Sequence, residues 1–292
     1  MLRYSTLRNL SKLNLNYLNM KNYLKLFCVF CAAILFTKCS SDDDNTNSAE
    51  LEGEGNIEFF FDNSFNNDDL LLSASTYVNS LGETFKVNRM SYIVSNFSLT
   101  DEDGNVFTYP EDDSYFIISE EDQEVKVVLQ NIPAGNYTSM KFGVGVPMDK
   151  YVQGETSQQE FWDFAATRNM TWAWIVGYKF VNFEGEFTSN ELANMHDFKI
   201  HIGSHGEALD NYREIELSFP RTAQVRTDRT PDVHLVADAN KILDGTNKFE
   251  LTPLLNDAGA SQIMVDAERA PLVADNFMEM FYVDHIHSNT SH

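Results

Sequence analysis

The sequence predicts an all-β fold, an immunoglobulin-like β-sandwich with a few short helical insertions. Two observations support this prediction. Many short segments alternate apolar and polar side chains or are rich in aromatic and β-branched residues, and turn-forming residues separate them. Helical spacing of apolar residues occurs in few places. Repeated short strands joined by turns are typical of sandwiches, because each strand buries one face against a second sheet.

The chain begins with a segment that has the pattern of an export signal. Residues 1–38 contain six basic residues and no acidic residue, and an apolar run of eleven residues lies between Leu26 and Phe36. This run matches a signal-peptide core and is shorter than the roughly 20 residues of a membrane-spanning helix. Met20 is a more natural start than Met1, which marks residues 1–19 as a candidate over-extension of the reading frame.

Cys39 directly follows this segment and precedes an acidic stretch. An apolar core that ends at a cysteine resembles a bacterial lipoprotein signal, in which the cysteine is acylated and becomes the first mature residue. Lys38 is not the small residue of the strictest form, but it fits looser forms that resemble those of Bacteroidetes lipoproteins. We therefore expect lipid on Cys39 and anchoring to the outer membrane, facing the periplasm or the cell surface. A plain secretory signal or an uncleaved anchor helix is the alternative.

Removal of residues 1–38 would leave a mature chain without a free thiol. Cys28 and Cys31 would leave with the signal, and lipid would consume Cys39. Stability must then come from a packed core, and any metal site must use histidine, methionine or oxygen ligands. The mature chain would carry 15 basic against 44 acidic residues, a net charge of −29. Such a field excludes nucleic acid as a partner and attracts cations.

The expected elements follow the signal in order. Residues 39–55 are polar and acidic, which predicts a flexible tether, and the domain covers residues 56–287. The turn at residues 101–105 predicts a hairpin, and helical spacing predicts helices at 160–166 and 270–281. The expected strands are 56–61, 90–100, 106–109, 115–118, 125–129, 137–146, 198–202, 214–219 and 233–236.

The seven histidines are unevenly placed, and none precedes residue 196. In the expected strand 198–202, the apolar side chains face one way and His201 faces the other, so we expect its imidazole to be open to water or a ligand. A glycine-flanked turn could return His205 toward it, and His234 lies in a separate strand-like segment. Neutral imidazoles that converge without thiolate suit Cu(I), Cu(II) or Zn(II). Exposed surface histidines are the alternative.

Two further groups bear on the site. If residues 170–174 form a strand, Met170, Trp172 and Trp174 share one face, where they form either part of a site or part of the core. The last histidines of the chain are expected to belong to a polar C-terminal tail; they are His285, His287 and His292.

The order of these motifs resembles a known family. The segment 170–174, Met-Thr-Trp-Ala-Trp, is followed by Gly-Tyr-Lys-Phe at 177–180, Glu-Gly at 184–185 and Phe-Lys-Ile-His-Ile-Gly at 198–203. Together with Asn-Phe at 96–97 and Gly-Val-Gly-Val-Pro at 143–147, this pattern is similar to the methanobactin-operon periplasmic copper proteins, the MbnP-like domain. The resemblance extends over residues 56–285.

The resemblance implies a β-sandwich that binds copper through histidines. His201 matches the histidine of the family's His-x-Gly segment, and Trp172 and Trp174 match its tryptophans. In some members a tryptophan near the site is oxidised to kynurenine by a partner di-haem protein of the cytochrome c peroxidase class. The metal ligands we expect are His201, with His205 and His234 added from their place in the sequence.

The sequence leaves two functions open. The first is a lipoprotein of the cell envelope that binds copper or another transition metal through histidines. The second is a lipid-anchored module that binds glycans or proteins on an exposed aromatic surface, with Tyr151, Trp162 and Tyr212 as its candidates. We do not expect an enzyme, because no nucleophile–base arrangement or catalytic motif is present.

Overall fold

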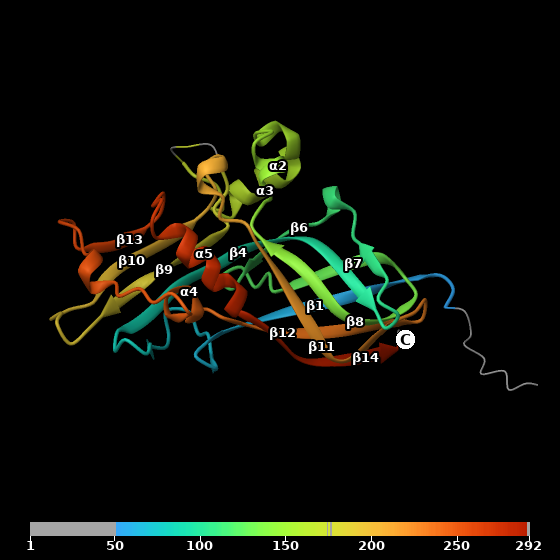
Figure 1. Cartoon of the computed structure of the whole chain (residues 1–292). Helices are drawn as coiled ribbons and strands as arrows, with labels where there is room; N and C mark the ends of the chain where they lie inside the picture. Colours follow the sequence, from blue (N-terminus) through green and yellow to red (C-terminus); the bar gives the residue numbers. More distant parts are fainter. Residues whose placement is uncertain (1–50, 174, 176, 291–292) are drawn as a thin grey trace, which may run out of the picture. The chain divides into compact units, whose positions relative to one another are not determined.

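The computed structural model describes residues 51–173, 175 and 177–290 (Figure 1). The predicted signal segment, the start at Met20, lipidated Cys39 and most of the acidic tether lie outside the described residues, as do Trp174 and His292. In the described part of the chain, no helix is both long and apolar enough to cross a membrane.

The fold is a β-sandwich with short helices, as the sequence predicts. The smaller sheet has the strand order β14-β12-β1-β2, with β7 also paired to β1. Its strands are β1 (Glu54–Phe65), β2 (Asp68–Asp69), β7 (Lys126–Pro133), β12 (Arg229–Asp238) and β14 (Phe281–Thr290). Strands β1 and β12 run parallel, whereas β12 and β14 are antiparallel.

The larger sheet has the order β11-β8-β4-β9-β10-β13, and the long strand β4 also pairs with β3, β5 and β6. Its strands are β3 (Tyr77–Val78), β4 (Thr84–Asp101), β5 (Val106–Thr108), β6 (Tyr115–Ser119), β8 (Gly135–Val144), β9 (Val181–Thr188), β10 (His196–Ile202), β11 (Arg213–Val225) and β13 (Ala260–Ile263). Every expected strand is confirmed, while β2, β3, β9, β13 and β14 were not predicted.

An aromatic cluster fills the space between the sheets. Phe61 of β1 lies 6.2 Å from Tyr92 of β4, 5.9 Å from Phe142 of β8 and 6.3 Å from Phe281 of β14, measured between ring centroids. All three ring pairs meet edge to face, the arrangement that aromatic quadrupoles favour. Phe142 also stacks on Phe97 at 5.7 Å. These side chains come from both sheets, so they hold the two layers together.

The predicted hairpin at residues 101–105 connects β4 to β5. Asp101 shapes the turn because one of its carboxylate oxygens accepts hydrogen bonds from the amides of Asp103 at 2.9 Å and Asn105 at 2.8 Å. Gly104 adopts a φ of 84°, a left-handed conformation that glycine tolerates best. The strands then pair from Ser98–Thr108 to Thr100–Val106.

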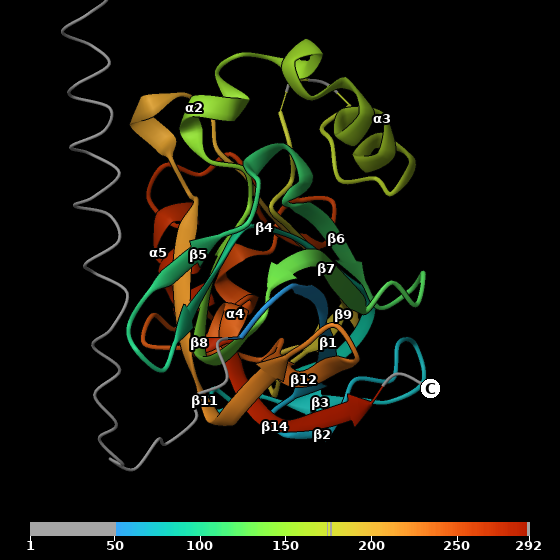
Figure 2. The same ribbon diagram turned by 90° about the vertical axis from the view of Figure 1, so that its right-hand side faces the viewer.

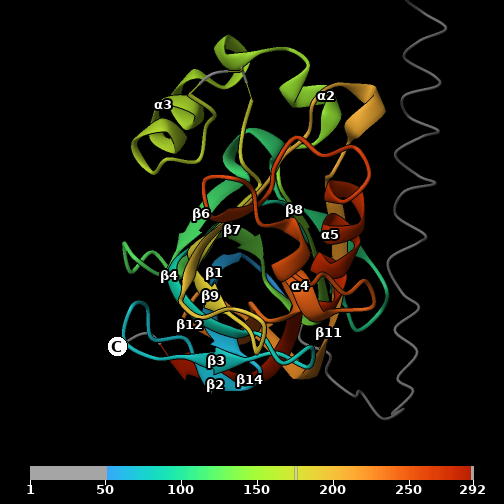
Figure 3. The same ribbon diagram turned by 90° about the vertical axis from the view of Figure 1, so that its left-hand side faces the viewer.

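The short helices gather in two places. Figure 2 shows α2 (Met148–Tyr151) and α3 (Gln159–Thr167) together at one end of the sandwich. Figure 3 shows α4 (Lys241–Asp244) beside α5 (Ala270–Asn276). The amide of Asn276 joins these two helices by donating to the carbonyl of Ile242 at 3.2 Å. Single 3-10 turns lie at Glu111–Asp113, Glu155–Gln158, Glu207–Leu209, Thr252–Leu254 and Phe277–Glu279.

The predicted helix at 160–166 is confirmed by α3, but the prediction of a helix at 270–281 is wrong at its end. The α-helix stops at Asn276, a 3-10 turn follows, and Phe281 already begins β14. The apolar spacing that suggested a longer helix has another cause. Phe277 and Met280 are fully buried because the turn packs them into the core, and Phe281 is buried as the first residue of a strand.

Candidate functional site

Strand pair β9–β10 positions His201. Phe198, Ile200 and Ile202 face the core between the sheets, and His201 lies on the opposite face, as the alternation predicts. That face is covered, however, and His201 is only 7% exposed. The expectation that its imidazole is open to water is therefore wrong, because a loop from the preceding segment of the chain packs over it.

This covering loop has two described arms, residues 169–173 and 177–180, and it does not form the strand that would align Met170 with Trp172. Its two arms meet at a bridge between Thr171 and Tyr178, and the amide of Trp172 donates to the carbonyl of Gly177 at 3.1 Å. The amide of Phe180 donates to the carbonyl of Ile202 at 2.6 Å, which ties the loop to the end of β10. Trp172 is 6% exposed.

Trp172 contacts both histidines of the predicted pair. Its ring centroid lies 5.7 Å from that of His201 and 5.5 Å from that of His205. His205 follows β10 in a turn that its own amide closes by donating to the carbonyl of Leu209 at 2.9 Å. The indole N–H of Trp172 donates to the carbonyl of Tyr178 at 3.1 Å. We call the group of Trp172, His201 and His205 the tryptophan pocket.

Gly203, the glycine of the His-x-Gly segment, allows the loop to approach this closely. A Cβ at this position would lie 2.2 Å from the carbonyl oxygen of Tyr178 and 3.3 Å from the indole nitrogen of Trp172. The first distance is far inside van der Waals contact, so only glycine fits without moving the loop.

Gly203→Ala is therefore expected to push the Trp172 loop away from β10 and expose the indole. The measurement is the tryptophan fluorescence emission, which is expected to shift to the red and to become accessible to iodide. Gly206→Ala is a nearby comparison that meets no atom within 4 Å, although its φ of 81° adds backbone strain. Unchanged emission in Gly203→Ala would contradict the close approach.

A carboxylate orients His201. Its Nε2 lies 2.6 Å from Oε1 of Glu184, and hydrogen bonding from His201 is the main cause that lowers the pKa of this carboxyl group. An ionised carboxylate can only accept, so the proton of the imidazole resides on Nε2 and Nδ1 is the nitrogen with a lone pair. Burial lowers the pKa of His201, although the bond to Glu184 opposes this effect. His201 is thus neutral at pH 7.

His205 differs from His201 in having no such partner. Its Nε2 is buried and makes no hydrogen bond with any described residue. Burial also lowers the pKa of His205, so the ring is neutral at pH 7. A buried nitrogen without a partner loses its hydration without compensation, a cost of about 1–3 kcal/mol. Such a nitrogen fits a metal ligand.

Lys179 adds a positive charge beside the tryptophan pocket. Its ammonium lies 5.8 Å from the centroid of the Trp172 ring and donates to the backbone carbonyl of Asn169 at 2.9 Å. Burial lowers its pKa, while the charge of Glu184 raises it. Glu184 thus offsets Lys179 and also orients His201. Sequence reasoning did not identify Glu184 as part of the site. The strand that contains it alternates Asn182 and Glu184 with buried phenylalanine and glycine.

His234 does not join the tryptophan pocket. It lies in β12 on the other sheet, stacked between Phe60 at 5.0 Å and His285 at 4.3 Å, measured between ring centroids. The prediction of a polar C-terminal tail is also wrong for His285 and His287, because both residues belong to strand β14, which pairs with β12. The signal that could have identified them is the alternation of His285, buried Ile286 and His287.

The aromatic residues of the alternative function do not form an exposed platform. Tyr151, Trp162 and Tyr212 are partly buried and pack against a small apolar cluster. The rings of Trp162 and Tyr178 meet edge to face at 5.0 Å. The hydroxyl of Tyr212 accepts a hydrogen bond from the amide of Asn96 at 3.2 Å. These contacts assign the three rings to packing at the end of the sandwich that carries α2 and α3.

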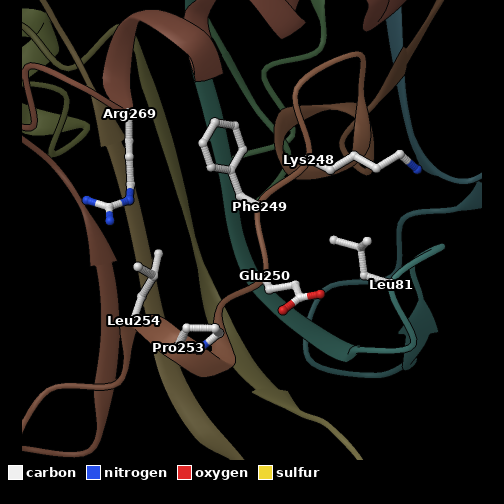
Figure 4. Close-up of a pocket in the computed structure, with 7 residues that line it drawn as sticks. All are labelled: Leu81, Lys248, Phe249, Glu250, Pro253, Leu254 and Arg269. Carbon is white, nitrogen blue, oxygen red and sulfur yellow. The ribbon is translucent and has the colours of Figure 1, made fainter.

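A shallow pocket of about 330 Å³ lies elsewhere on the domain (Figure 4). Its cations are already neutralised, because Lys248 pairs with Asp244 at 2.7 Å and Arg269 pairs with Asp266 at 2.9 Å. No histidine or tryptophan lines it. Its lining consists of Leu81, Lys248, Phe249, Glu250, Pro253, Leu254 and Arg269.

Comparison with known proteins identifies the family. No curated protein matches the chain. One solved structure, MbnP from Methylosinus trichosporium, is similar with a TM-score of 0.45 and 15% identity, over 68% of this chain and 81% of that one. The sequence model of the MbnP family matches residues 54–264, from the first strand to the end of β13. Because this match covers most of the chain, the protein belongs to the MbnP family.

Proposed function

We propose that this protein binds copper in the tryptophan pocket, with His205 and His201 as ligands. The observation that carries the proposal is the buried Nε2 of His205, which has no hydrogen-bond partner among the described residues and lies beside Trp172. A metal ion bound there would compensate the lost hydration of this nitrogen. Imidazole nitrogen is a ligand that copper prefers, and no thiolate is available among the described residues.

The surroundings of His201 support the same proposal. Histidines that ligate metals usually donate their second N–H to a carboxylate or carbonyl, which fixes the tautomer and raises the basicity of the ligand nitrogen. Glu184 accepts such a bond from His201 at 2.6 Å. Two neutral imidazoles, one buried and one partly buried, suit Cu(I) better than a divalent ion, because burying a single charge costs less. When bound, copper would contribute a redox-active, soft cation at this place.

The role of Trp172 follows from its position. Its ring contacts both imidazoles, so Trp172 is the tryptophan that an external oxidant would modify beside a bound metal. The resemblance to methanobactin-operon copper proteins makes a di-haem protein of the cytochrome c peroxidase class the proposed oxidant. The chain itself would act as a binding protein and not as an enzyme.

The proposed location is the cell envelope. The basic, apolar and cysteine-containing start of the chain supports export and lipid attachment at Cys39. Anchoring to the outer membrane would hold the domain where extracellular copper arrives. The strong negative charge of the chain would attract cations toward it.

An anaerobic titration of the full-length protein with Cu(I), in competition with a chromogenic chelator, tests this function. We expect one Cu(I) per chain in the wild type and clearly weaker binding in His201→Ala. His196→Ala is the matched control, because His196 belongs to the same strand but lies against the carbonyl of Gly259 at 3.2 Å. Copper binding that does not exceed the chelator background in the wild type would contradict the proposal.

A further inference from the structure

A second group of histidines lies on the smaller sheet. His234, His285 and His287 each offer a ring nitrogen, and these nitrogens all lie within 4.8 Å of one another. We call them the histidine triad. The ring centroids of His285 and His287 are 4.7 Å apart, and those of His234 and His287 are 5.4 Å apart. None of the three residues belongs to the tryptophan pocket.

An irregularity in strand β14 creates this group. The pairing of β14 with β12 runs from Leu235–Val283 directly to His234–His285, which leaves Asp284 as an extra residue. Before this bulge, Phe281 faces the core; after it, Ile286 does so. The bulge therefore turns His285 and His287 to the outer face of the sheet, where His234 also lies. In a regular strand, His285 would face the core with Phe281.

The positions in the sheet then determine the spacing. His285 lies directly opposite His234, and His287 lies opposite Asp232, one step along the same face. Figure 2 shows the two strands side by side at the edge of the sandwich. Direct cross-strand neighbours have Cβ atoms about 4.5–5.5 Å apart, close enough for both rings to reach one ion. Strand β14 is the edge strand of this sheet, and on its outer face the side chain of His287 is exposed while His285 and His234 are partly buried.

Asp284 prepares His285 for metal binding. Its Oδ2 lies 2.7 Å from Nδ1 of His285, so the ring donates its Nδ1 proton to the carboxylate and Nε2 is left with the lone pair. Carboxylate, histidine and metal in this order form the arrangement that orients many metal ligands. The residue that forms the bulge therefore also fixes the tautomer of the neighbouring ligand.

The charges around His234 also favour a cation. Burial and the neighbouring His285 and His287 lower the pKa of His234, whereas Asp232 and Asp62 raise it. Asp62, Asp232 and Asp284 together place negative charge around the three imidazoles. A divalent ion would relieve the mutual repulsion of these carboxylates.

We propose that the histidine triad is a metal site that binds Cu(II) at the protein surface, independently of the tryptophan pocket. Imidazole ligands in an open, hydrated place suit Cu(II), which stands above Zn(II) in affinity for a given nitrogen site, so Zn(II) is the weaker competitor. Metal–nitrogen bonds of about 2.0–2.1 Å require ligand nitrogens roughly 3 Å apart. His287 is exposed and His285 is half-buried, so side-chain rotation brings their nitrogens to this spacing.

The test is an aerobic titration of the metal-free, full-length protein with Cu(II) in a glycine buffer that removes weakly bound copper. We expect one ion to bind at the triad, with an electron paramagnetic resonance spectrum that contains splittings from three imidazole nitrogens. His287→Gln is expected to weaken this binding at least tenfold and to leave two coupled nitrogens. Asp284→Asn is expected to weaken it about 10–100-fold, because the orienting carboxylate is lost.

Two controls separate this site from the tryptophan pocket and from misfolding. His205→Ala is expected to leave Cu(II) binding at the triad unchanged, and the triad variants are expected to leave Cu(I) binding in the tryptophan pocket unchanged. Because the triad lies on the outer face, His287→Gln is expected to unfold at the wild-type temperature. Equal Cu(II) affinity and nitrogen count in the wild type, His234→Gln and His287→Gln would overturn the proposal.

Discussion

Replacing His205 with alanine is expected to weaken Cu(I) binding by more than about 100-fold, because loss of a ligand exceeds the 10–100-fold effect of losing an outer-shell partner. The physical reason is that His205 offers a buried Nε2 that no described residue satisfies. Removing it eliminates a metal ligand without breaking a side-chain hydrogen bond of that nitrogen. The measurement is the Cu(I) dissociation constant against a competing chelator.

His201→Ala provides the contrast. It removes a ligand and also breaks the 2.6 Å bond to Glu184, which leaves a half-buried carboxylate without this partner. We therefore expect His201→Ala to lower both copper affinity and the unfolding temperature, whereas His205→Ala lowers only copper affinity. A His205→Ala protein that binds Cu(I) as tightly as the wild type would contradict the assignment of this nitrogen.

The largest effect on stability is expected from Phe142→Ala. The Phe142 side chain is fully buried and touches Phe61, Phe97 and Phe281, with ring centroids 5.3–5.9 Å away. Truncation removes apolar contacts from both sheets and leaves a cavity between them. Phenylalanine-to-alanine changes in such cores cost about 3–5 kcal/mol. For a domain of this size we expect a fall in melting temperature of roughly 2–4 °C for each kcal/mol.

Phe164→Ala is the matched control for this prediction. Phe164 lies on α3, is 38% exposed and contacts the guanidinium of Arg168 at 5.0 Å. Its loss is expected to cost no more than about 1 kcal/mol, which is the range of an exposed cation–π contact. Thermal unfolding followed by circular dichroism measures both variants. Equal destabilisation by the two changes would contradict the central place of Phe142 in the core.

The sequence predicted strands best where the chain alternates regularly and turns are marked. In β10, the alternation of Phe198, Ile200 and Ile202 with polar residues gave the correct face for His201. Burial of that second face was not predictable, because the loop that covers it has no periodic pattern. Its position depends on the close approach at Gly203 and on backbone hydrogen bonds to the end of β10.

The grouping of the histidines shows a second limit of the sequence. The prediction placed His234 with His201, but its neighbours come from a strand about fifty residues further along the chain. The bulge at Asp284 changes which face His285 takes, and a one-residue shift in a strand reverses every following side chain. Such a shift depends on pairing with β12, and the local alternation of His285, Ile286 and His287 does not by itself show which face of the sheet the histidines take. Glu184 was missed for a related reason, because it reaches His201 across a strand pair.

The most direct test of copper binding in the tryptophan pocket is a crystal structure grown with Cu(I) under anaerobic conditions and measured at the copper absorption edge. Anomalous scattering locates copper independently of any assumption about ligands. We expect a peak beside Trp172 at about 2 Å from Nε2 of His205, the length of a metal–imidazole bond, with Nδ1 of His201 as the second ligand. A crystal that binds copper elsewhere and shows no peak at His205 would contradict this assignment.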